Sequence, residues 1–94
     1  MKRGELLRDA AIIVEERNQA YGKPEDCFEF IAGLWSAYLR EEILPEDVVN
    51  MMILLKVSRE KQNHKLDNYK DIAGYSACGA ELWHEIDVEE GECD

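Results

Sequence analysis

Carboxylate side chains spaced one helical turn apart are the residues of this sequence with the clearest potential for chemistry. Asp67 and Asp71 are four residues apart, which places both on one face of a helix. Carboxylates presented in this way by facing helices can hold Mg²⁺ through oxygen ligands and water, leaving room for substrate phosphates. The sequence therefore predicts an acidic magnesium site, with Glu29, Asp47, Asp67 and Asp71 as its ligands.

A simpler interpretation applies to most of the acids that lie near helix starts. Acidic side chains in the first turn of a helix interact favourably with its positive end, without any metal. Asp71 differs, because it lies a full turn inside the helix if Asp67 is the N-cap residue, so both interpretations remain open for it. The acids for which the capping interpretation is favoured are Glu25, Asp26, Glu46 and Asp47.

Basic and aromatic side chains near these acids suit a nucleotide-like ligand. Positive charges could hold phosphates, and tyrosine rings could stack on a base. Each also has an ordinary alternative, because basic residues complement the negative end of a helix and aromatic residues at helical spacing are usually core. The predicted ligand-binding residues are Tyr21, Lys23, Arg59, His64, Lys65, Asn68 and Tyr75.

Several enzyme classes are not expected from the motifs of this chain. The sequence contains no Ser-His-Asp order, Walker loop, G-x-G-x-x-G or H-E-x-x-H motif. Acyl transfer, kinase chemistry and dinucleotide oxidoreduction are therefore set aside. A lone histidine in a polar segment, His64, gives little support for general base catalysis.

Four helical segments must position these side chains. Gly22 is suited to end the first helix, predicted over residues 5–20, and Pro24 to begin the second, predicted over residues 24–40. Pro45 predicts the start of the third helix, and Asp67 or Asn68 the N-cap of the fourth, which should continue to about residue 85. Residues 58–65 are predicted to be a frayed helix end and a loop. Small residues in the fourth helix allow another backbone or ring to come close.

The third helix is apolar on almost every side, with Asn50 as the only polar residue between Asp47 and Lys56. A helix of this kind is expected to be buried against several neighbours, within one chain or across a subunit boundary. Asn50 is then interpreted as a buried polar contact that fixes helix register or a subunit interface. The alternative is a ligand or metal contact together with Asp47.

Length and composition predict an all-α protein with a single-domain four-helix antiparallel bundle in residues 1–86. A chain of 94 residues forms one small core, so a homo-oligomer is expected. Residues 87–94 are predicted to be a disordered acidic tail, since seven of the 21 acidic residues lie between Glu81 and Asp94. The net charge of −10 argues against a nucleic-acid partner.

Neither a membrane span nor a disulfide framework is indicated. The N-terminus carries charges where a signal peptide needs an apolar run, and no segment approaches about 20 consecutive apolar residues. Cys27, Cys78 and Cys93 are odd in number and form no C-x-x-C pair. We therefore expect a cytoplasmic protein, with Cys27 and Cys78 as small buried hydrophobic residues.

Several strings of the sequence, in order, resemble a family of small phage and prophage proteins of unknown function. The resemblance covers approximately residues 5–83 and implies no reaction. One departure is Cys27, where the family pattern leads us to expect asparagine, so a ligand contact at this position would be altered. The strings include Arg17-Asn-Gln-Ala-Tyr-Gly-Lys-Pro-Glu-Asp-Cys-Phe28, Pro45-Glu-Asp-Val-Val-Asn-Met-Met52 and Asp67-Asn-Tyr-Lys-Asp-Ile-Ala-Gly-Tyr75.

A more distant resemblance is to the all-helical MazG-like nucleoside triphosphate pyrophosphatases, whose E-x-x-E and E-x-x-D pattern is not reproduced in full. It implies a helical fold and a Mg²⁺-dependent nucleotide hydrolase as one hypothesis. The second hypothesis is a non-catalytic oligomeric protein that sequesters a nucleotide-like signal, and the third is an inhibitor of a host protein that uses the acidic tail. Whether the protein is an enzyme is left open by the sequence.

Overall fold

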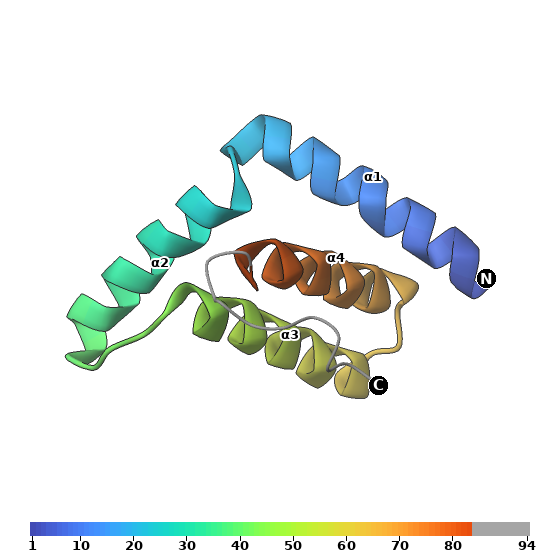
Figure 1. Cartoon of the computed structure of the whole chain (residues 1–94). Helices are drawn as coiled ribbons and strands as arrows, with labels where there is room; N and C mark the ends of the chain where they lie inside the picture. Colours follow the sequence, from blue (N-terminus) through green and yellow to red (C-terminus); the bar gives the residue numbers. More distant parts are fainter. Residues whose placement is uncertain (84–94) are drawn as a thin grey trace, which may run out of the picture.

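Four helices make up nearly all of the structure that the computed structural model describes, residues 1–83 (Figure 1). They are α1 (Arg3–Tyr21), α2 (Pro24–Leu39), α3 (Pro45–Gln62) and α4 (Leu66–Leu82). No strand is present in this described part of the chain, so the predicted all-α, four-helix fold is confirmed. The predicted tail, residues 87–94, and Cys93 lie outside the described residues.

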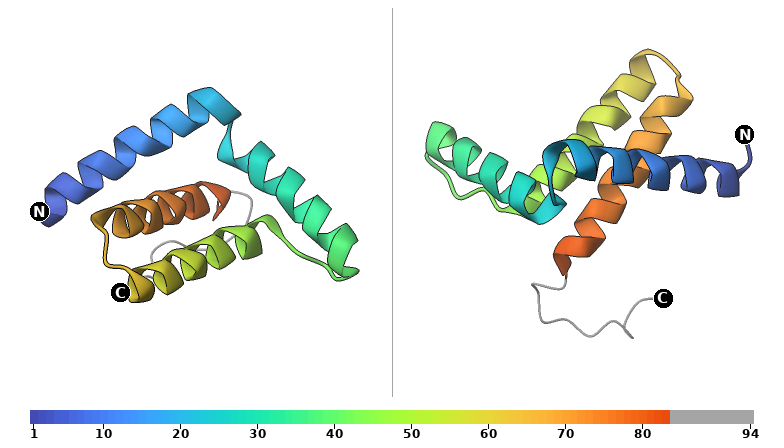
Figure 2. Two further views of the ribbon diagram at one scale, coloured as in Figure 1. Left: turned by 180° about the vertical axis from the view of Figure 1, so that it is seen from behind. Right: turned by 90° about the horizontal axis from the view of Figure 1, so that it is seen from above.

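The four helices are arranged as an antiparallel pair crossed by a bent arm (Figure 2). α3 and α4 lie side by side, α1 packs on α4, and α2 contacts both α3 and α4. α1 and α2 diverge from a sharp corner at Gly22, whose φ of 89° is strained for other residue types. The Gly22 amide donates a hydrogen bond to the carbonyl of Asn18 at 2.9 Å, which ends α1 as predicted.

Both prolines begin helices as the sequence predicts. Pro24 and Pro45 are the first residues of α2 and α3, where a missing N–H costs nothing. Asp47 accepts a hydrogen bond from the Leu44 amide at 2.9 Å and so caps α3. At the other end of the α2–α3 connection, the Ser36 hydroxyl accepts a hydrogen bond from the Ile43 amide at 2.8 Å. These contacts fix the connection without a long loop.

The turn between α3 and α4 differs from the prediction. α3 continues to Gln62, so the loop predicted over residues 58–65 is much shorter, and α4 begins at Leu66. Lys65 occupies the N-cap position, so the prediction that Asp67 or Asn68 is the N-cap is wrong. The physical reason is that Glu60 accepts a hydrogen bond from the Lys65 amide at 3.0 Å, which satisfies a free donor at the helix start.

The core lies where α2, α3 and α4 meet. Val48 is completely buried, and glycines on α4 let its neighbours approach closely, because a Cβ at Gly74 would lie 3.3 Å from Val14 and one at Gly79 3.2 Å from Val49. This close approach confirms the prediction drawn from the small residues of α4. The buried apolar residues of the core are Phe28, Ala32, Val48, Val49 and Leu82.

One side of α3 is open in the single chain. Asn50 is exposed, so its interpretation as a buried polar contact is wrong for one copy of the chain. The reason is that Val48 and Val49 direct the buried face of α3 toward α2 and α4, leaving Leu54 on the far side 64% exposed. Among residues 1–83, no helix combines the length and apolar character that crossing a membrane requires.

Candidate functional site

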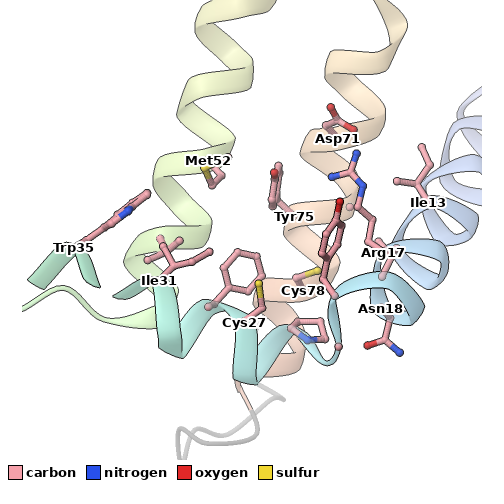
Figure 3. Close-up of a pocket in the computed structure, with 17 residues that line it drawn as sticks. Ile13, Arg17, Asn18, Cys27, Ile31, Trp35, Met52, Asp71, Tyr75 and Cys78 are labelled. Atoms are coloured by element: carbon pink, nitrogen blue, oxygen red, sulfur yellow. The ribbon is translucent and has the colours of Figure 1, made fainter. Parts of the chain in front are cut away.

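A pocket of about 200 Å³ lies among the four helices, close to the corner between α1 and α2 (Figure 3). Its walls are largely apolar or aromatic, and every helix contributes to them. Phe28 and Tyr75 form one wall as an edge-to-face pair with ring centroids 6.4 Å apart. Other lining residues are Ile13, Val14, Cys27, Ile31, Trp35, Val48, Met52, Gly74 and Cys78.

Two charged side chains lie on the side of the pocket where α1 faces α4. Arg17 reaches in from α1 and Asp71 from α4, whereas Asn18 lines the pocket nearer the α1–α2 corner and points away from both (Figure 3). Lys56 on α3 forms an ion pair with Asp71 at 3.0 Å, and the two side chains are only 15% and 17% exposed. Because removing two opposite charges from water together is less costly than removing either alone, Lys56 fixes the Asp71 carboxylate at the pocket.

Three of the predicted ligand-binding residues lie at this pocket or beside it. Tyr21 and Tyr75 both line it, with Tyr21 at the surface and 74% exposed. Lys23 lines a neighbouring hollow that shares Asn18 and Pro24 with the pocket. The structure therefore groups the residues at the α1–α2 corner with Tyr75 of α4.

The other predicted ligand-binding residues lie around the turn between α3 and α4, where Glu60 is the central group. Glu60 accepts a hydrogen bond from the side-chain amide of Asn68 at 2.9 Å and contacts His64 Nδ1 at 2.7 Å. The same side-chain amide of Asn68 also donates a hydrogen bond to the backbone carbonyl of Asn63 at 3.3 Å. His64, Lys65 and Asn68 thus contribute to the turn itself, and Arg59 is exposed nearby on α3.

These hydrogen bonds set the acidity of Glu60. They lower the pKa of its carboxyl from 4.5 to about 2, with the Asn68 amide as the largest cause, followed by the Lys65 backbone amide and His64. Each donor favours the ionised carboxylate over the neutral acid. The turn is therefore built around a carboxylate that stays charged well into the acidic range.

The four predicted metal ligands do not converge within one chain. Asp71 is paired with Lys56, Asp67 is 4.0 Å from Lys70, Asp47 caps α3, and Glu29 is exposed on α2. They belong to three different helices, α2, α3 and α4. Within residues 1–83 no group of three or more Asp, Glu, His or Cys side chains is placed to hold a metal ion. The predicted magnesium cradle therefore does not fit this arrangement.

Sequence reasoning missed several residues that the structure places at the two polar regions. Arg17 and Asn18 precede Tyr21 by four and three residues, so helical spacing could have grouped all three on one face of α1. Lys56 gave no such signal, because its partner Asp71 lies on α4. For Glu60, the four-residue spacing to His64 was a signal, whereas its hydrogen bonds from the Lys65 amide and from Asn68 depend on the turn. Cys27 and Cys78 are half-buried in the pocket wall, and burial is the main cause that raises the pKa of the Cys78 thiol.

Comparisons with known proteins identify relatives but no reaction. Residues 5–83 match the family described as "Domain of unknown function (DUF6378)". The "Gene 55 protein" of Mycobacterium phage D29 is 40% identical over 82 residues, covering 85% of this chain and 54% of the relative. The "Gene 55 protein" of Mycobacterium phage L5 is 49% identical over 67 residues, covering 69% of this chain and 43% of the relative.

The chain thus spans about half the length of these curated relatives. No solved structure matches it. The family match covers nearly all of the described helices, including every residue that lines the pocket. On this evidence the chain belongs to the DUF6378 family, an uncharacterised family with members encoded by phages.

Proposed function

We propose that this protein binds a nucleotide-like small molecule in the pocket among its four helices, without catalysing a reaction on it. The observation that carries the proposal is the combination of apolar, aromatic walls with a few polar side chains. Ligand sites for small organic molecules commonly have this composition, in which apolar walls supply affinity and placed polar groups fix orientation.

The size and walls of the pocket favour a planar ring. An apolar cavity of about 150 Å³ can hold benzene, and this pocket has a volume of about 200 Å³. The faces and edges of Phe28, Trp35 and Tyr75 offer aromatic contacts that stabilise a ring inside a pocket. A nucleobase satisfies both requirements.

The polar side chains of the pocket supply the groups that a nucleotide needs. Asp71, held by Lys56, can accept a hydrogen bond from a ring N–H, and Asn18 can donate or accept one. Arg17 is a good partner for phosphate oxygens, because its planar guanidinium donates two parallel hydrogen bonds. Lys23 lies in the adjoining hollow, which is also lined by Glu15, Glu25, Asp26 and Glu81, so Arg17 is the cation that lines the pocket itself.

The distribution of acids favours binding over hydrolysis. Metal-assisted hydrolysis of a phosphate calls for carboxylates that share a metal ion beside the substrate. Among the residues that line the pocket, Asp71 is the one carboxylate, and Lys56 already neutralises it. In a phage-encoded relative of the DUF6378 family, sequestration of a nucleotide signal in the host cytoplasm is a role that such a pocket would serve.

The test is thermal melting with a panel of nucleosides, nucleoside phosphates and cyclic nucleotides, each with and without Mg²⁺. A ligand at 100 times its Kd stabilises the folded state by about 2.7 kcal/mol, which raises the Tm of a domain this size by roughly 10–20 °C. We expect such a shift without Mg²⁺. Arg17→Ala should reduce it, whereas the matched variant Arg8→Ala on the same helix should not, because Arg8 lies outside the pocket.

Two results would contradict the proposal. A Tm shift that requires Mg²⁺ and fades as pyrophosphate or inorganic phosphate accumulates would indicate a hydrolase in place of a binding protein. If no compound of the panel shifts the Tm, the proposal of a nucleotide-like ligand is wrong, and a protein partner becomes the next hypothesis to test.

A further inference from the structure

One carboxylate lines the ligand pocket, and its position on α4 determines which edge of a bound ring it can contact. Asp71 precedes Tyr75 by four residues, so the carboxylate and the phenol ring lie on the same face of α4, and both line the pocket (Figure 3). A planar ring that packs against Tyr75 therefore presents an edge to Asp71. The hydrogen-bonding groups on that edge decide whether the ring fits.

The Asp71 carboxylate can accept further hydrogen bonds beside its ion pair with Lys56. Lys56 Nζ lies 3.0 Å from Asp71 Oδ2, and Lys56 is not among the residues that line the pocket. Within the described part of the chain, no other residue forms a hydrogen bond or ion pair with the Asp71 side chain. Two carboxylate oxygens together offer about four acceptor positions. An ionised carboxylate donates no hydrogen bond, so the ligand must supply the donors.

The low exposure of this ion pair makes the acceptor selective. The Asp71 side chain is 17% exposed and that of Lys56 is 15% exposed, so little water reaches the carboxylate. A ring that directs N–H groups at Asp71 replaces the water it displaces. A ring that directs an acceptor at Asp71 leaves two groups without hydrogen bonds, which polar sites of this kind reject strongly.

We propose that the base bound in the pocket is guanine, whose N1–H and 2-amino groups donate paired hydrogen bonds to the Asp71 carboxylate. This inference rests on the proposed nucleotide-binding function and names the base. Guanine has two adjacent donors on one edge, and a carboxylate accepts both in parallel, as it does from arginine. Hypoxanthine keeps N1–H alone. Adenine and cytosine have an acceptor nitrogen beside the amino group, and the N3–H of uracil lies between two carbonyls.

Arg17 and Asp71 then have separate roles at the pocket. Asp71 contacts the base, whereas Arg17 is exposed on α1, has no hydrogen bond or ion pair within residues 1–83, and is free to contact the phosphate. The preference for one base over another should therefore depend on Asp71. Arg17→Ala should weaken the binding of different nucleoside monophosphates by a similar factor.

The first test is isothermal titration calorimetry of the full chain with GMP, IMP, AMP and CMP, without Mg²⁺. IMP is the matched control ligand, because it lacks only the 2-amino group of GMP. We expect GMP to bind at least about tenfold more tightly than IMP, AMP or CMP, since a paired hydrogen bond to a base edge discriminates by this order. Guanosine and inosine should show the same ratio, because the ratio originates in the base.

The second test changes the acceptor. Asp71→Asn should reduce the GMP-to-IMP affinity ratio to about one or less, because the asparagine oxygen still accepts from N1–H while its amino group opposes the 2-amino group. Asp67→Asn is the matched variant on the same helix, with a side chain that is 82% exposed and outside the pocket, and it should leave the ratio unchanged. Lys56→Gln combined with Asp71→Asn avoids an unpaired buried lysine and should give the same ratio as Asp71→Asn alone.

The outcomes separate this inference from the proposed function. Binding of AMP, CMP or IMP as tight as that of GMP would overturn the assignment of guanine and leave a nucleotide pocket in place. A GMP-to-IMP ratio that Asp71→Asn does not change would also overturn it. If none of these compounds binds, the proposed function itself is wrong, and the inference fails with it.

Discussion

The two polar regions of this molecule are built from similar residues but differ in how those residues are satisfied. At the turn between α3 and α4, Glu60 accepts hydrogen bonds from Asn68 and Lys65 and contacts His64. At the corner between α1 and α2, Arg17 and Asn18 face a pocket, and within residues 1–83 no hydrogen bond or ion pair of their side chains is found.

This difference separates a structural role from a binding role. Polar groups that satisfy one another stabilise the chain and have little capacity left for a ligand. Polar groups without partners beside a cavity keep their hydrogen-bonding capacity for a molecule that enters it. The turn between α3 and α4 is therefore interpreted as a stabilising element of the fold, and the corner between α1 and α2 as the candidate binding site. Three sets of substitutions test this contrast.

The largest effect is expected for Phe28→Ala, because the corner is held together by apolar packing. Phe28 is 7% exposed and belongs to both the core and the pocket wall. Its removal should lower the free energy of unfolding by about 3–5 kcal/mol. Urea unfolding followed by the fluorescence of Trp35 and Trp83 measures this. A loss smaller than that of any single change at the turn would contradict the view that packing dominates the corner.

An intermediate effect is expected when asparagines of the two regions are compared. Asn68 is buried and donates to Glu60, so Asn68→Ala should lower the free energy of unfolding by about 1–3 kcal/mol. Asn18→Ala should change it by less than about 0.5 kcal/mol, because its side chain makes no hydrogen bond within residues 1–83. Urea unfolding of both variants checks this. Similar losses for the two would remove the distinction between the regions.

The smallest effect concerns the pH dependence of stability at the turn. The pKa of Glu60 is about 2 in the folded protein, against an ordinary value of 4.5, so it stabilises the fold fully above pH 4.5. This contribution is lost as the pH falls from about 4.5 toward 2. Glu60→Gln should therefore lose less stability over this interval than the wild type, as measured by urea unfolding at several pH values.

The matched control for this pH series is Glu16→Gln on the exposed side of α1. It removes one carboxylate without disturbing a hydrogen-bonded group, so its pH dependence should follow that of the wild type. If Glu60→Gln and Glu16→Gln behave alike, the hydrogen bonds at the turn do not hold the Glu60 carboxylate in its ionised form.

Local features of the sequence predicted the helices better than the sites. Pro24, Pro45 and Gly22 act through their own backbone restrictions, so their effects do not depend on distant residues. The end of α3 was missed because it depends on Glu60 receiving hydrogen bonds from Lys65 and Asn68, which follow it in the chain. Residue type alone suggested a frayed end there.

The candidate site was predicted in part, and for a clear reason. Tyr21 and Tyr75 are predicted to stack on a base and Lys23 to hold a phosphate. The structure places all three at or beside the pocket. His64 and Asn68 were selected by the same criteria, yet they serve the turn. A sequence shows which side chains are able to bind a ligand. Packing decides which of them already form hydrogen bonds or ion pairs within the protein.

By itself, the sequence determined the all-α class, the two helices that begin at proline, the closure of α1 at Gly22 and the phage-related family. These follow from backbone preferences and residue order, which are local. The tertiary structure decided that Asp71 pairs with Lys56, that Phe28 meets Tyr75, and that α2 keeps an uncharged face open. Those outcomes required the packing of separate helices, because a side chain gains a partner only when another part of the chain is brought to it.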